Sequence, residues 1–117
     1  MIDVSIMSAD DRDLLTFAAK AAGFHTSWQD YTLWVRRGAD LWTVWEPLYH
    51  DGQAFRLALE LEMPIHPGRV WKSYRAGCLG DFVEASRDIT PISDPKATRR
   101  AIVEVAAEVG KAMQEAA

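Results

Sequence analysis

The sequence has few of the features that mark disulfide-bonded, zinc-binding or membrane-spanning proteins. Cys78 is the only cysteine among 117 residues, so no intrachain disulfide can form and a reducing compartment is expected. No charge-free run approaches the roughly 20 apolar residues of a membrane helix. Residues 1–13 contain several aspartates and no basic region of the kind that opens a secretory signal. We therefore expect a cytoplasmic protein.

An excess of positive charge is also missing. The formal net charge is −4, which opposes a general attraction to nucleic acid or anionic lipid, so such binding requires a local basic patch. Hydrophobic residues make up 49% of the chain and charged residues 26%, which is the balance of a globular protein rather than a disordered one. With no repeat and no long linker, the chain is expected to form a single domain over residues 1–117.

The first predicted helix covers residues 9–22. Ser8 and Asp11 have the spacing of a capping box, and apolar residues recur at three- and four-residue intervals after them. Gly23 can adopt the left-handed conformation that ends a helix. We expect this helix to pack close to the last helix of the chain.

Two further helices are predicted from their start signals. Asp51 is a candidate N-cap for a helix over 53–63. Asp94 as cap and Pro95 at the first helical position start a long C-terminal helix. The expected buried stripe of that last helix consists of Ile102, Val105, Val109, Ala112 and Met113.

Aromatic and β-branched residues between 24 and 45 predict a hairpin around Gly38. Residues 24–28 are a candidate for a further strand before it, with a turn near Gln29 and Asp30. If Gly38 supplies a positive φ angle in a short loop, the register follows from the loop. It pairs Arg36 with Asp40, Trp34 with Trp42, Leu33 with Thr43 and Tyr31 with Trp45.

Both faces of this predicted hairpin carry large apolar groups. A sheet with one wet face should show polar residues on that side, so we expect helices to cover both faces. Two more strands are predicted over 70–75 and 82–85, joined by a loop over 76–81. The expected fold is therefore α+β, a small three-layer α/β/α sandwich. Its mainly antiparallel sheet has four to five strands, with three helices in the order α-β-β-α-β-β-α.

Several short motifs together resemble a known family. They are LWV at 33–35, LW at 41–42, WEPL at 45–48, DGQAFRLA at 51–58 and TRRAIVEVAA at 98–107. The chain resembles the phage ABA sandwich domain, a family of small phage and prophage proteins related to NinX-type accessory proteins. The resemblance implies an α/β/α sandwich of phage or prophage origin in the cytoplasm of a bacterial host cell, with no established activity and no catalytic residue to carry over. Glu46 departs from the small polar residue expected before the proline, which leaves the shape of that turn open.

Candidate catalytic groups have plainer structural explanations. His50 beside Asp51 could be a general base, but adjacent residues rarely form that hydrogen bond and Asp51 is expected to cap a helix. Cys78 could be a nucleophile activated by His50 or His66, although no family signature surrounds it. A thiol or histidine hydrolase is therefore a remote alternative, and we expect no enzymatic activity and no cofactor. No metal-ligand spacing joins His25, His50, His66, Glu46, Glu60 and Glu62.

One local basic and aromatic patch is present. Arg69, Lys72 and Arg75 alternate with Trp71 and Tyr74, a combination used for stacking on single-stranded nucleic acid. On a strand, however, Lys72 and Tyr74 face away from the other three residues, which splits the patch. A solvated strand edge is the favoured interpretation, and a nucleic-acid-binding accessory factor is the alternative.

The tryptophans favour a protein interface over chemistry. Large aromatics on strands usually belong to the core, and any that stay exposed, such as Trp28 or Trp71, would mark an interaction surface. We therefore expect a non-enzymatic accessory protein of phage or prophage origin that binds a phage or host protein, or itself.

Overall fold

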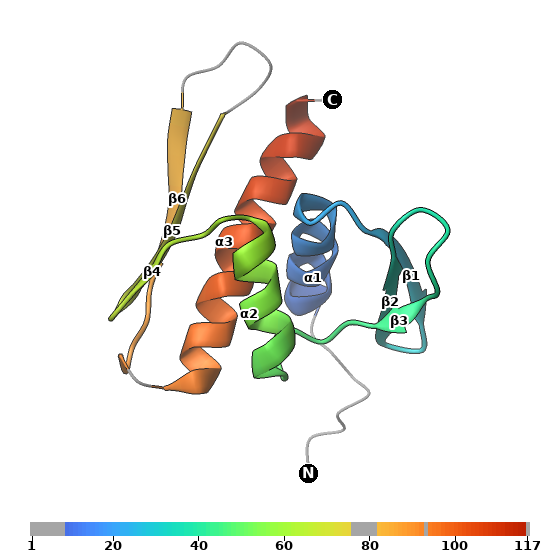
Figure 1. The fold of residues 1–117 in the computed structure, drawn as a ribbon, viewed down its shortest axis with the longest axis horizontal. Coiled ribbons are helices and arrows are strands. Elements are labelled where there is room, and N and C mark those ends of the chain that lie inside the picture. Colours follow the sequence, from blue (N-terminus) through green and yellow to red (C-terminus); the bar gives the residue numbers. More distant parts are fainter. Residues whose placement is uncertain (1–8, 76–81, 93, 117) are drawn as a thin grey trace.

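The computed structural model describes residues 9–75, 82–92 and 94–116, which form three helices and two antiparallel three-stranded sheets. Figure 1 shows the helices lying between the two sheets, with one sheet on each side of the molecule. The predicted α+β class, the three helices and the order in which helices alternate with strands are confirmed. None of the helices in the described part of the chain is long and apolar enough to cross a membrane.

Helix α1 (Ala9–Ala21) matches the predicted range to within one residue. Asp10 and Asp11 lie in its first turn, where negative charge is stabilised by the helix dipole. Gly23 follows the helix with a φ angle of +80°, which fits its predicted role in ending the helix. The predicted capping side chain, Ser8, lies outside the described residues.

Helix α2 (Asp51–Glu60) starts and ends earlier than predicted. His50 occupies the N-cap position without a side-chain capping bond, so the prediction that Asp51 is the cap is wrong. Asp51 is instead the first helical residue, and its Oδ1 atom accepts a hydrogen bond from Arg99 Nη1 at 2.6 Å. The helix ends before residue 63 because Glu62 takes a left-handed φ angle of 52°.

Helix α3 (Pro95–Ala116) begins as predicted. Asp94 Oδ1 accepts a hydrogen bond from the backbone N–H of Lys96 at 3.0 Å, which confirms the cap. Ile102, Val105 and Val109 are buried as expected. Met113, by contrast, is 46% exposed, because α3 continues past the end of α1 in Figure 1.

α1 and α3 pack against each other, as predicted, and their contact is the most extensive between any two elements. Gly110 makes the close approach possible: a Cβ atom at this position would lie 1.8 Å from the carbonyl oxygen of Phe17. Ala18, Ala19 and Ala106 are fully buried, and their small side chains also allow α1 and α3 to pack closely. The core of the molecule is therefore centred on α3.

The first sheet contains β1 (His25–Gln29), β2 (Thr32–Arg36) and β3 (Thr43–Val44) in that order. Its tight hairpin joins β1 to β2 through Asp30 and Tyr31, which have φ angles of 51° and 63°. The predicted register of the second hairpin is wrong by two residues: Trp34 pairs with Val44, not with Trp42. The loop around Gly38 is longer than a tight turn, so the partners shift toward the C-terminus.

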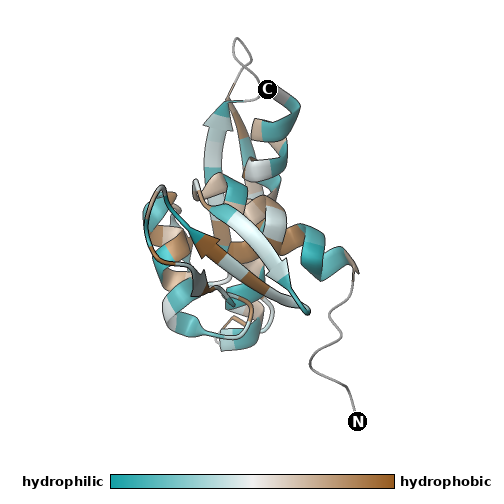
Figure 2. Cartoon of the chain, turned by 90° about the vertical axis from the view of Figure 1, so that its right-hand side faces the viewer, coloured by the Kyte–Doolittle hydropathy of each residue, from teal (hydrophilic) through white to brown (hydrophobic). Residues whose placement is uncertain are grey.

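Only one face of this sheet is covered by helices. Leu33, Val35 and Trp45 are buried on the inner face, whereas Trp42 is 37% exposed and outside the strands. Figure 2, which looks onto this sheet, shows β2 as an apolar strand beside the more hydrophilic β1. The expectation that helices cover both faces of the hairpin is therefore wrong. The Arg36 guanidinium lies over the Trp42 ring at 4.6 Å instead, and supplies part of the missing cover.

The second sheet contains β4 (Ile65–His66), β5 (Arg69–Arg75) and β6 (Phe82–Asp88) in that order. The strands predicted at 70–75 and 82–85 are confirmed, with β6 three residues longer than expected. The six strands form two separate sheets rather than a single sheet of four to five strands. The layers accordingly run sheet, helices, sheet, and the predicted loop over 76–81 lies outside the described residues.

Candidate functional site

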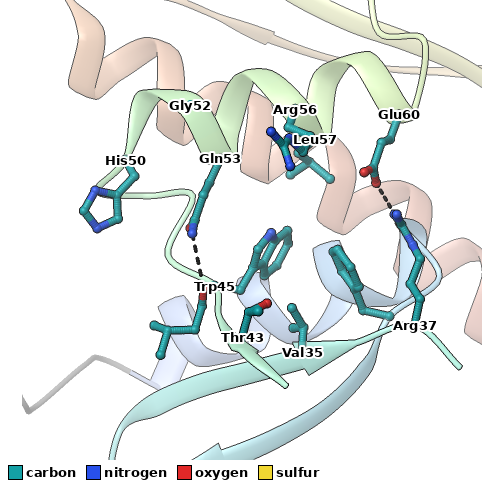
Figure 3. Close-up of a pocket in the computed structure, with 12 residues that line it drawn as sticks. Val35, Arg37, Thr43, Trp45, His50, Gly52, Gln53, Arg56, Leu57 and Glu60 are labelled. Atoms are coloured by element: carbon teal, nitrogen blue, oxygen red, sulfur yellow. Dashed lines mark hydrogen bonds and ion pairs between the residues drawn. The ribbon is translucent and has the colours of Figure 1, made fainter. Parts of the chain in front are cut away.

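A cleft lies between α2 and the inner face of the first sheet (Figure 3). Its volume is about 580 Å³, within the range of small-molecule sites. Val35, Trp45 and Leu57 form an apolar floor, and each of them is at least 94% buried. Phe24 completes the floor, with its ring 5.4 Å from the Trp45 ring at an interplanar angle of 64°. This is an edge-to-face arrangement, which fixes both rings.

Gln53 holds the β3 side of the cleft to α2. Its Nε2 atom donates a hydrogen bond to the Val44 carbonyl at 3.2 Å, and its Oε1 atom accepts one from the Glu46 backbone N–H. These two backbone groups point away from β2, because Trp45 N–H, between them, bonds to Leu33 in β2. The side-chain amide of Gln53 therefore takes the place of a peptide group on a neighbouring strand at this sheet edge.

An ion pair closes the other end of the cleft. Arg37 Nη2 is paired with Glu60 Oε2, and the same guanidinium donates hydrogen bonds to the Ala22 carbonyl and lies 4.4 Å from the Phe24 ring. Figure 3 shows this pair bridging the loop after β2 to the C-terminal end of α2. The charges of Arg37 and Glu60 thus compensate each other. Arg56 also lines the cleft and has no ion pair or hydrogen bond within the described part of the chain.

The structure does not assemble the catalytic groups considered from the sequence. Asp51 is engaged by Arg99, whose Nε atom also donates to the Leu48 carbonyl at 2.9 Å. His50 lines the cleft and His66 lies in β4. Cys78 lies outside the described residues, so the proposed nucleophile has no described position. Within residues 9–75, 82–92 and 94–116, no group of three histidine, cysteine or acidic side chains is placed to hold a metal ion.

A second feature of α2 is an exposed apolar surface, which we call the α2 surface and define by Phe55, Leu59 and Ile65. Their exposed fractions are 58%, 60% and 40%. Phe55 and Ile65 border a groove of about 240 Å³, whose other walls are Ala54, Pro95, Thr98, Ile102 and the ion pair of Asp51 with Arg99. Phe55 and Leu59 are four residues apart on the helix and therefore lie on the same side.

The predicted basic and aromatic patch is split as expected. Val70 is buried toward α3, so Lys72 and Tyr74 share its face, while Arg69, Trp71 and Arg75 lie on the outer face. On that outer face Arg69 is ion-paired with Glu84 of β6. The Arg75 guanidinium lies 4.9 Å from the ring of Phe82.

Tyr74 and Trp28 belong to the interior side of their sheets. Burial raises the pKa of Tyr74, and the negative charges of Glu108 and Glu115 raise it further. Trp28 is half-buried, donates a hydrogen bond to Thr16 Oγ1 at 3.2 Å and is covered by Arg12 at 4.7 Å. The predicted binding residues therefore form no single surface.

Sequence reasoning missed the cleft because its parts come from different elements. Arg37 and Glu60 are 23 positions apart, and neither stands in a recognisable motif. The α2 surface was missed as well, because apolar residues of a predicted helix are usually assigned to the core, whereas Phe55 and Leu59 are more than half exposed.

Comparison with known proteins gives no relative for this chain: no family model matches it, and neither a curated protein nor a solved structure is similar to it. The resemblance to the phage ABA sandwich domain therefore stays a prediction that rests on the motifs quoted above.

Proposed function

We propose that this chain is a non-enzymatic accessory protein that acts by binding protein, and that its first partner is a second copy of itself. The observation that carries the proposal is the α2 surface. Leu59 and Phe55 expose more than half of their side chains on a helix that has other faces available to water. Contiguous exposed apolar side chains mark interaction sites more often than isolated ones do.

Self-association is supported by the shape of the surface. Phe55 and Leu59 project from α2, and the groove beside Phe55 has room for a branched apolar side chain. A surface that holds both projections and a groove can pair with its own copy through a two-fold axis, which closes the assembly at a dimer. In an antiparallel pairing of α2 helices, Leu59 of the second copy would enter the groove beside Phe55.

Phage or prophage origin remains part of the proposal and rests on the resemblance alone. The alternative of nucleic-acid binding has less support. Arg69 is ion-paired with Glu84, and Lys72 lies on the opposite face from Arg69 and Arg75. This leaves little uncompensated positive charge on the outer face of the second sheet, where phosphate binding would need it.

Sedimentation velocity of the full chain over a concentration series tests the proposal. The α2 surface is smaller than a standard interface of about 800 Å² per partner, so we expect a weak dimer with a Kd on the order of 100 µM. Leu59→Glu should keep the protein monomeric, because it places a charge at the centre of the interface while preserving helix propensity.

Leu41→Glu is the matched control. Leu41 is 87% exposed and lies outside the α2 surface, so the same change in charge and size should leave the dimer intact. A protein that sediments as a monomer up to about 1 mM, ten times the expected Kd, would refute self-association through this surface. So would an equal loss of dimer in both variants.

A further inference from the structure

The cleft between α2 and the first sheet combines an apolar floor with hydrogen-bond donors that have no acceptor. Trp45 is the central residue of the floor and is 6% exposed. Its indole N–H makes no hydrogen bond to any described residue, in contrast to that of Trp28. A nearly buried donor without a partner is unfavourable unless a solvent molecule or a ligand supplies the acceptor.

Solvent reaches the Trp45 donor. Among the described residues, Arg36 Nε is the side-chain nitrogen that has no hydrogen-bond partner and no contact with solvent. Trp45 Nε1 also has no partner but is not in that class, so it keeps some contact with solvent. Since Trp45 lines the cleft, the accessible part of its side chain opens onto that space. Figure 3 shows the indole in the middle of the cleft, between α2 and β3.

Arg56 adds an uncompensated positive charge to the same space. Figure 3 shows Arg56 on α2 beside Leu57, on the side of the helix that borders the cleft. The neighbouring Arg37 is neutralised by Glu60, so the cleft carries a net positive charge although the whole chain carries −4. A guanidinium and an indole N–H are both donors, and neither can accept a hydrogen bond.

We infer that this cleft is a binding site for a small organic carboxylate with an aromatic or branched apolar body. The apolar body would lie against Phe24 and Trp45, whose edge-to-face pair offers a fixed aromatic wall. The carboxylate would accept from Trp45 Nε1 and from Arg56, whose planar fork matches a carboxylate. A nucleotide fits less well, because a single uncompensated cation cannot neutralise several phosphate charges.

The proposed dimer and this site can be tested separately. Gln53 and Glu60 line the cleft, away from Phe55 and Leu59, whereas Arg56 is three residues before Leu59 and lies between the two surfaces. The dimer test changes Leu59 and the binding test changes Arg56, so failure of one proposal can be told apart from failure of the other.

Phenylacetate is a suitable probe, because it joins a phenyl ring to a carboxylate. The experiment is a titration of the ¹⁵N-labelled full chain, followed through the indole N–H signals of its five tryptophans. We expect the signal assigned to Trp45 by Trp45→Phe to shift saturably. Phenylacetamide, which has the same shape without the charge, should bind about tenfold more weakly. Phenethylammonium should not bind.

Arg56→Gln is the decisive variant, because it removes the charge from an exposed position without disturbing the floor. It should weaken phenylacetate binding about tenfold, to the level of the amide. Arg75→Gln is its control: Arg75 is exposed on β5, outside the cleft, and its replacement should leave the affinity unchanged.

Three results would overturn the inference. The first is no shift of the Trp45 signal at millimolar phenylacetate in about tenfold molar excess over the protein. The others are equal affinity for phenylacetate and its amide, or equal weakening by Arg56→Gln and Arg75→Gln. If Trp45→Phe does not fold, the Trp45 signal can be assigned through its contacts with Phe24, so the test stands without that variant.

Discussion

Replacing Gly110 by alanine should destabilise the protein strongly, because the two longest helices meet at this residue. The added Cβ would lie 1.8 Å from the carbonyl oxygen of Phe17 and 2.7 Å from its carbonyl carbon. Both atoms belong to the backbone of α1, so no change of rotamer can relieve the overlap. Normal contact is about 3.5 Å, and α1 and α3 must therefore separate by roughly 1.5 Å or bend.

The cost follows from what surrounds the contact. Leu15, Ala18, Val103 and Ala106 are fully or almost fully buried, and a gap of roughly 1 Å forfeits up to half of their dispersion contacts. Overpacking of this kind costs about 1–3 kcal/mol and occasionally more, while alanine regains about 1 kcal/mol over glycine in a helix. Because the obstacle is backbone, we expect the upper end of the range: a net loss of about 2 kcal/mol and a fall in Tm of roughly 8 °C.

Urea denaturation monitored by far-ultraviolet circular dichroism measures this loss, with Gly52→Ala as the matched control. Gly52 also lies in a helix, but nothing is within 4 Å of the Cβ it would gain, so its replacement should be neutral or slightly stabilising. If Gly110→Ala and Gly52→Ala unfold at the same urea concentration as the parent protein, α1 and α3 are too far apart at Gly110 for a Cβ atom to overlap the backbone of Phe17.

Two further predictions concern the sheets. Gln53→Ala removes both hydrogen bonds at the edge of β3 and should lower the free energy of unfolding by about 1–3 kcal/mol, whereas Gln29→Ala, which removes an exposed bond, should change it little in the same urea titration. Tyr74 has a raised pKa in the folded protein, so it favours folding below about pH 10, its usual pKa in the unfolded chain, and this contribution is lost as the pH rises through the folded value. Tyr74→Phe should therefore reduce the loss of stability between neutral and strongly alkaline pH; an unchanged pH profile would show that Tyr74 does not contribute.

The helix boundaries could be predicted where local chemistry sets them. Asp94 and Pro95 start α3 because a carboxylate can accept the free N–H of Lys96 and proline needs no donor there. The same reasoning misplaced the start of α2. Aspartate is a common N-cap residue, but the carboxylate of Asp51 is bonded to Arg99 of α3 instead. A partner 48 positions away cannot be found from local sequence.

The hairpin register could not be predicted because it depends on loop length. Gly38 has the expected positive φ angle of 54°, yet it lies in a loop that spans more residues than a tight turn. The tight turn is at Asp30 and Tyr31, and Tyr31 is an unusual residue for a positive φ angle. The prediction that Gly38 has a positive φ angle was therefore correct, but the prediction that it lies in a short hairpin loop was wrong.

The prediction that helices cover both faces of the first hairpin was wrong for a different reason, because it treated tryptophan as purely apolar. Trp42 is 37% exposed and lies under the Arg36 guanidinium, so a cation rather than a helix covers it. One wet face is therefore compatible with large aromatic rings when arginines lie beside them. The same pattern recurs on the second sheet, where Arg69 lies 5.9 Å from Trp71.

Both proposals depend on α2, and its sequence explains how one short helix can serve two surfaces. Ala54, Leu57 and Ala58 are buried, which uses one face of the helix for the core. Small residues at two of these positions bring α2 close to α3, so its flanks stay near the surface. One flank then carries Phe55 and Leu59, and the other carries the polar residues that line the cleft. Since core packing fixes the rotation of the helix, it also fixes which chemistry each flank presents, and a substitution on one flank should leave the other in place.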